Sequence, residues 1–105
     1  MHREAALVVV AALLLACVDW VPLTAEGQRV RVASAAEVAG CKLLGTATAR
    51  TKVTVGPMAR DEAKIEAELE ALARNEAGTM GGNAIVPTGP VDWDHRSYEV
   101  RRCEG

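Results

Sequence analysis

The sequence predicts an α+β fold, with about four strands in a mostly antiparallel sheet and one main helix on one face. The first observation behind this prediction is a single long helical pattern in the middle of the chain, at residues 58–80. The second is that two short strand-type segments precede the helix and two follow it, giving the order β-β-α-β-β. The third is the size: 105 residues without Phe suit one small domain with an aliphatic core.

The first strand is predicted at residues 29–32, where polar and apolar residues alternate. Ser34 and Glu37 have the spacing of a capping box, which predicts one short helical turn. A second strand is expected at residues 41–48, with Gly45 marking a bulge or a close approach. The segment that follows, to Gly56, either extends this strand or forms a loop.

The main helix is predicted to begin at Met58, with Pro57 at its first turn. Asp61 suits this end because a carboxylate stabilises the positive end of a helix dipole. The charged run 61–70 is interpreted as a solvated helix face. The opposite face is apolar and is predicted to be buried; it carries Ile65, Leu69, Leu72, Ala73 and Ala77.

A third strand is predicted at residues 84–86, where a continuous apolar run favours a central place in the sheet. The last strand is expected at residues 97–103. In a regular strand Tyr98 and Val100 share one face, and Cys103 lies on the opposite face.

The N-terminal segment Ala5–Cys17 carries no charge and is shorter than the ~20 apolar residues that a spanning helix needs. It ends in Leu13-Leu14-Leu15-Ala16-Cys17, which resembles the lipobox of a bacterial lipoprotein signal peptide. The resemblance implies cleavage before Cys17 and a lipid on its sulfur. We therefore expect a signal peptide at 1–16, the lipidated Cys17 and a tether at 17–28, and the domain at 29–105.

Two alternatives to the lipobox remain open. The apolar run is either a buried core helix or a plain secretory signal cut after Ala25, which would remove Cys17. In enterobacterial lipoproteins an Asp after the lipidated Cys retains the protein at the inner membrane, and here Val18 stands in that place. The resemblance thus implies a lipid-anchored protein of the outer membrane that faces the periplasm.

The chain contains three cysteines. If Cys17 is acylated, Cys41 and Cys103 remain, and the count predicts one disulfide between them. The compartment outside the inner membrane permits that bond. It would close a loop of about 60 residues and contribute roughly 4 kcal/mol in the chain-entropy model.

The end of the helix and the strands beside it carry a family resemblance. Gly81-Gly82-Asn83-Ala84-Ile85-Val86 follows the helix, Cys41 precedes a Leu-Gly pair, and the last strand ends in Cys103. With the lipobox, this ordered set resembles the small envelope lipoproteins related to RcsF and an uncharacterised lipoprotein family beside them. RcsF has four cysteines beyond its anchor, whereas this chain has two. The resemblance is therefore nearer to the uncharacterised family.

The motif after the helix has a structural interpretation. Gly81 and Gly82 permit positive φ at a sharp turn from helix to strand, and Asn83 can bond its own backbone. Ala84 lets strand and helix approach closely. The alternative is a glycine loop that binds a ligand.

The formal net charge of −2 gives no electrostatic basis for binding nucleic acid. The sequence contains no nucleophile elbow, zinc-protease motif, Walker A loop or dinucleotide fingerprint. We therefore expect a protein that is not an enzyme and has no cofactor. It would act through contact with another envelope protein, in envelope sensing or assembly.

One cluster offers another function. Asp92-Trp93-Asp94-His95 combines two carboxylates and an imidazole, which would begin a metal or ligand site in a periplasmic binding module. A zinc site built from Cys41, Cys103 and His95 is a further possibility. The plainer interpretation is a polar hairpin loop in which Trp93 anchors a partner or covers the core.

Overall fold

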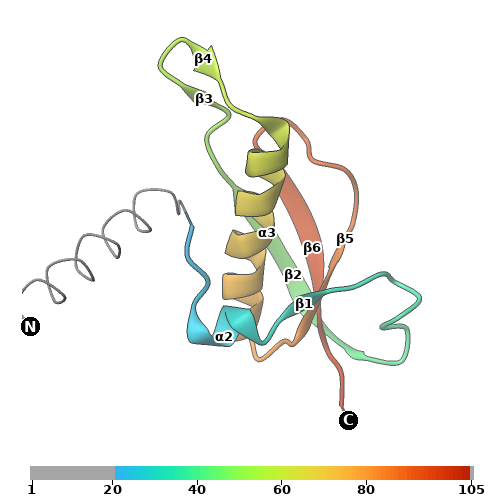
Figure 1. Ribbon diagram of the computed structural model, residues 1–105. Helices are drawn as coiled ribbons and strands as arrows, with labels where there is room; N and C mark the ends of the chain where they lie inside the picture. The colour runs from blue at the N-terminus through green and yellow to red at the C-terminus, as the bar shows by residue number, and fades with distance from the viewer. Residues whose placement is uncertain (1–20, 105) are drawn as a thin grey trace, which may run out of the picture.

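The computed structural model describes residues 21–104. It contains a four-stranded mixed sheet, ordered β1-β5-β6-β2, with one long helix on one face (Figure 1). The predicted α+β class is confirmed, with two strands of this sheet before the helix and two after it. A separate two-stranded hairpin pairs β3 with β4. The elements are α2 Ala25–Gln28, β1 Arg31–Val32, β2 Lys42–Arg50, β3 Thr54–Val55, β4 Met58–Ala59, α3 Glu62–Thr79, β5 Ala84–Pro87 and β6 His95–Arg102.

The sheet is antiparallel except at one edge, where β1 pairs parallel to β5. β5 lies between β1 and β6, which confirms the central position predicted from its apolar run. At the other edge β2 pairs along its length with β6, from Lys42 opposite Arg102 to Arg50 opposite His95. The register shifts between Leu43 and Gly45, so the predicted irregularity at Gly45 is present.

The helix begins later than predicted, at Glu62, and the reason lies in the preceding residues. Met58 pairs with Val55 in the β3–β4 hairpin, whose turn contains Gly56 with a φ of 60°. Pro57 therefore lies in this turn and not in the first turn of the helix. The N-cap is Asp61, whose side chain accepts a hydrogen bond from the Ala63 N–H.

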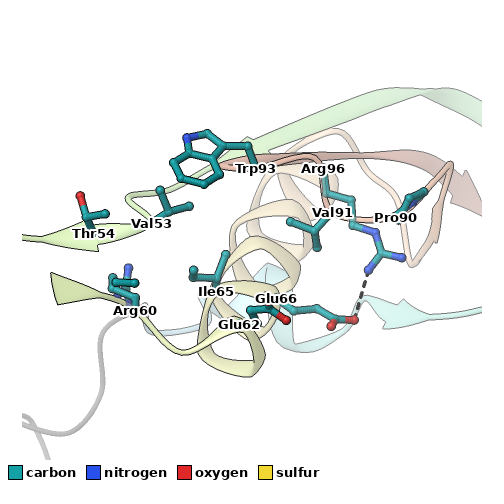
Figure 2. A pocket seen from close by; sticks show the side chains of 11 residues that line it. Val53, Thr54, Arg60, Glu62, Ile65, Glu66, Pro90, Val91, Trp93 and Arg96 are labelled. Carbon is teal, nitrogen blue, oxygen red and sulfur yellow. Dashed lines mark hydrogen bonds and ion pairs between the residues drawn. The ribbon is translucent and has the colours of Figure 1, made fainter.

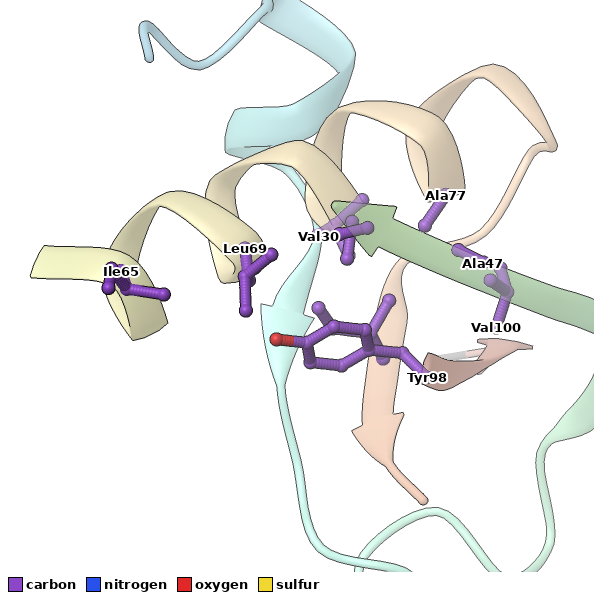
Figure 3. Close-up of a cluster of buried hydrophobic side chains, with 10 residues drawn as sticks. Val30, Ala47, Ile65, Leu69, Ala77, Tyr98 and Val100 are labelled. Carbon is purple, nitrogen blue, oxygen red and sulfur yellow. The ribbon is translucent and has the colours of Figure 1, made fainter. Parts of the chain in front are cut away.

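The main core lies between α3 and the sheet (Figure 3). The predicted helix face is confirmed, with Leu72 only partly buried. Because this face of α3 carries Ala73 and Ala77, the helix lies close to the sheet, and no large aromatic residue is needed to fill the space between them. The buried residues of this cluster are Val30, Ala47, Ala49, Ile65, Leu69, Ala73, Ala77, Ile85, Tyr98 and Val100.

The charged run on α3 is not wholly solvated, which corrects the prediction. Glu68 is buried, and its carboxylate lies 2.7 Å from the Arg60 guanidinium and accepts a hydrogen bond from the Thr51 hydroxyl at 3.1 Å. These partners compensate for burying the charge. The pair raises the pKa of Arg60, chiefly through the hydrogen bond to Glu68.

A second, smaller core lies on the face of the sheet opposite the helix. The turn that follows β1 packs there, with Val38 against Ala84 and Val86 of β5. Ser34 and Glu37 exchange the two hydrogen bonds of a capping box in this turn. Cys41 and Cys103 pack against the same cluster and form a disulfide. The predicted position of Cys103, away from the helix, therefore suits the bond.

Helix α3 turns directly into β5 through the glycine motif. Gly81 has a φ of 84°, and the Gly81 and Gly82 amides donate to the carbonyls of Gly78 and Ala77. This is the Schellman pattern of helix ends. The Asn83 side chain donates to and accepts from the Cys103 backbone, at 2.7 Å in both bonds, instead of bonding its own backbone. Only the first glycine needs positive φ; Gly82 is required because a side chain there would meet Val100.

The domain begins earlier than the predicted boundary at residue 29. Thr24 caps the short helix α2, and the Asn75 side chain of α3 bonds to the Thr24 N–H and the Pro22 carbonyl. Gly27 and Gly78 lie where the two helices meet, and a Cβ on Gly78 would approach Glu26 to 2.7 Å. The tether therefore does not extend to residue 28, because residues 22–28 are packed against α3.

We predict that Gly78→Ala destabilises the fold by about 1–3 kcal/mol, because the added methyl group pushes α2 away from α3. Urea unfolding of the full chain measures the loss, and hydrogen exchange of the α2 amides locates it. Gly40→Ala is the matched control, since a Cβ at Gly40 meets nothing within 4 Å. Equal stability of the two variants would contradict a close contact between α2 and α3 at Gly78.

Candidate functional site

Residues Asp92–His95 form a tight hairpin turn at the start of β6. The Asp92 and His95 amides each donate to the other's carbonyl, at 2.8 and 3.0 Å. Trp93 stands in this turn with a φ of 54°, the only positive φ of a non-glycine residue among residues 21–104. A bulky side chain rarely adopts that conformation. The turn therefore holds Trp93 outward at a cost in backbone strain.

The charged groups of this turn are paired with one another. Both oxygens of Asp94 lie 2.9 Å from Arg50 Nη1, and Asp94 Oδ1 lies 2.9 Å from His95 Nδ1. The hydrogen bond to His95 and then Arg50 lower the pKa of Asp94. Asp92 Oδ2 is 3.7 Å from the other ring nitrogen, His95 Nε2.

This arrangement does not build the metal site considered from the sequence. The two carboxylates lie at opposite nitrogens of the His95 ring, so they do not converge on one point. Within residues 21–104 no three His, Cys, Asp or Glu side chains gather as a metal site. The zinc site with Cys41 and Cys103 is wrong as well, because their sulfurs are joined in the disulfide at the far end of β6 from His95.

Three large apolar side chains are strongly exposed at the end of the molecule where α3 begins. Their exposed fractions are 73% for Trp93, 71% for Met58 and 66% for Val55. We call these three residues the Trp93 surface. A cavity of about 650 Å³ borders it, and its wall contains Val53, Ile65, Pro90 and Val91 (Figure 2).

A second concavity, of about 750 Å³, lies on another side of Trp93. Its lining includes Arg50, Lys52 and Glu68, and also Val21, the first residue that the structure describes. Trp93 was predicted as a contact residue, but its apolar neighbours were not, because Met58 was expected in the helix. The Gly56-Pro57 pair was the signal for a hairpin there.

The edge of the sheet at β2 is a second exposed feature. β2 is nine residues long, and among the described strands only β6 pairs with it. Its central residues, from Gly45 to Ala49, carry no charge. Long edge strands present unpaired backbone donors and acceptors that can pair with another chain.

The other predicted residues have simpler placements. Gly81, Gly82, Asn83 and Ala84 form the turn from α3 into the sheet, and fully buried Ala84 cannot meet a ligand. The structural interpretation therefore holds for the glycine turn. The predicted role of Ala84 is wrong, because Ala84 packs in the second core on the face of β5 away from α3 and does not let strand and helix approach. Cys17 and the signal peptide at 1–16 lie outside the described residues.

Comparison with known proteins finds one family. Residues 21–102 match the family described as "Domain of unknown function (DUF4156)". No curated protein and no solved structure matches the chain. Within residues 21–104, no helix has the length and apolar character needed to cross a membrane.

We predict that Trp93→Gly keeps or raises the thermal stability, because Gly adopts positive φ without the strain imposed on Trp. The gain is limited to about 1 kcal/mol, since Gly also loosens the unfolded chain. Calorimetry of both proteins measures it, with Trp93→Ala as the control that removes the ring and keeps the strain. A large loss of stability in both variants would contradict this prediction and would make the Trp93 ring a structural element.

Proposed function

We propose that this chain, which belongs to the DUF4156 family, is a membrane-anchored envelope lipoprotein that is not an enzyme and acts through protein contacts. Acylation of Cys17 would hold it at the outer membrane, facing the periplasm. The contacts would serve envelope sensing or assembly, in keeping with the resemblance to the lipoproteins related to RcsF.

The disulfide supports export from the cytoplasm. Cys41 and Cys103 are bonded across a sequence separation of 62 residues. Such bonds persist in the oxidising envelope and are rare in the reducing cytosol. The disulfide therefore agrees with the lipobox-like segment, since both are typical of proteins exported to the cell envelope.

The edge of β2 that no described strand pairs with is the observation that carries the proposed protein contact. The Thr51 N–H donates to the Asp94 carbonyl, so residue 51 faces β6. In an antiparallel pair, successive residues direct their backbone N–H and C=O groups alternately toward and away from the partner strand. The backbone groups of Ala49 and Ala47 therefore also face β6. The N–H and C=O groups of Thr48 and Thr46 accordingly point away from the sheet, where another strand can pair with them.

The side chains of β2 indicate the partner's chemistry. Lys42 and Arg50 stand at the two ends of an uncharged central stretch, and the strand contains no acidic residue. Two antiparallel copies of β2 would bring these like charges together, which disfavours self-pairing. An extended segment with small or polar residues and an acidic residue opposite Lys42 fits better, since Arg50 is already paired with Asp94. Its backbone would supply affinity, and the contact with Lys42 would set the register.

The test is photo-crosslinking in cells from p-benzoylphenylalanine in place of Leu43, an exposed residue of β2. We expect a discrete protein adduct that Thr48→Pro reduces about fivefold or more, because proline removes one outward donor and obstructs the incoming strand. Intact-mass analysis of the membrane fraction checks in parallel that the mature chain begins at an acylated Cys17.

The matched control is Thr48→Val, which loses the same hydroxyl bond to Ser97 but keeps the backbone N–H. It should leave the adduct unchanged. An adduct that survives Thr48→Pro would exclude the strand edge as the contact. A mature protein without acyl chains would exclude the anchor.

A further inference from the structure

We infer that the Trp93 surface rests in the interfacial layer of the same bilayer that holds the lipid on Cys17. This inference rests on the proposed acylation and adds an orientation to it. The bilayer would cover Val55, Met58 and Trp93, while the β2 edge would stay open to the side.

The short connection to the anchor is the first argument. Val21 lines one concavity with Trp93, and Cys17 precedes Val21 by four residues. A fully extended chain spans at most about 3.5 Å per residue, so the Cα atom of Cys17 lies within about 14 Å of the Cα atom of Val21. Helix α3 alone is about 27 Å long, from 18 residues at 1.5 Å each. The anchor therefore brings the end with Trp93 close to the lipid.

The residue types at this end are the second argument. Trp is enriched at the headgroup level of membranes, where its ring is partly apolar and its N–H bonds to water or lipid. Val55 and Met58 pair in the β3–β4 hairpin, which extends beyond the first turn of α3 (Figure 1). An exposed apolar pair at the tip of a hairpin is unfavourable in water and favourable in the acyl boundary.

The charges around the Trp93 surface decide which kind of membrane contact is expected. Arg50 is paired with Asp94 at 2.9 Å, and Arg60 is paired with Glu68 at 2.7 Å. Lys52 lines the second concavity and the exposed Asp92 adjoins Trp93, and these two charges have opposite signs, so the charged groups together give little net attraction to anionic lipid. Insertion would therefore depend on the apolar side chains, suit a surface rich in phosphatidylethanolamine, and change little with salt.

The experiment uses the full acylated protein with Trp20→Phe, which leaves Trp93 as the only tryptophan. It is reconstituted in phosphatidylethanolamine vesicles with and without brominated phospholipid, which quenches nearby indole rings. We expect the Trp93 fluorescence to fall about twofold or more in brominated vesicles, at both ~0.1 M and ~1 M salt. Replacing Val55 and Met58 with Ser should weaken the quenching and leave the acyl anchor intact.

The matched control moves the reporter to the opposite end. Trp20→Phe, Trp93→Phe and Ala36→Trp together place the only indole in the exposed turn after β1, which should remain unquenched. Acylated protein with unquenched Trp93 would overturn this inference, as expected if a protein covers the Trp93 surface, and would leave the proposed anchor standing. A chain without acyl groups would refute the anchor itself.

Discussion

The rest of the structure depends on the turn by which α3 passes directly into β5. Gly81 supplies the left-handed residue that ends the helix, and Gly82 lets the chain pass beside Val100 where no side chain fits. Asn83 then bonds twice to the Cys103 backbone. Helix, central strand and disulfide are thus joined within three residues, and the two cores form on opposite faces of β5.

The sequence allowed the sheet, the main helix face and the disulfide to be predicted because each depends on local periodicity or on a count of residues. Tyr98, Val100 and Ile65 follow simple spacing and lie in the core. The packed segment 22–28 was missed because Gly27 matters only once Gly78 is opposite it. Glu68 was missed for a similar reason, since its partners Arg60 and Thr51 come from other segments.

The candidate site was predictable in part. The spacing of Asp92, Asp94 and His95 indicated a turn, but their pairing with Arg50 and with each other depends on the β2–β6 register. Trp93 was predicted as a contact residue, but its neighbours Val55 and Met58 were not, because Met58 pairs with Val55 in a hairpin at the place where the helix was expected to begin. One end of the described molecule therefore exposes three large apolar side chains, while the β2 edge lies along its side.

Unfolding of Gly82→Ala in urea tests most directly whether the turn after α3 holds the fold together. A methyl group at Gly82 meets Val100 and the Ala77 carbonyl, so we predict a loss of about 1–3 kcal/mol or more and faster hydrogen exchange in β5. Gly89→Ala, in open space, should change little. If Gly82→Ala is as stable as Gly89→Ala, with β5 still protected, the turn does not have this role.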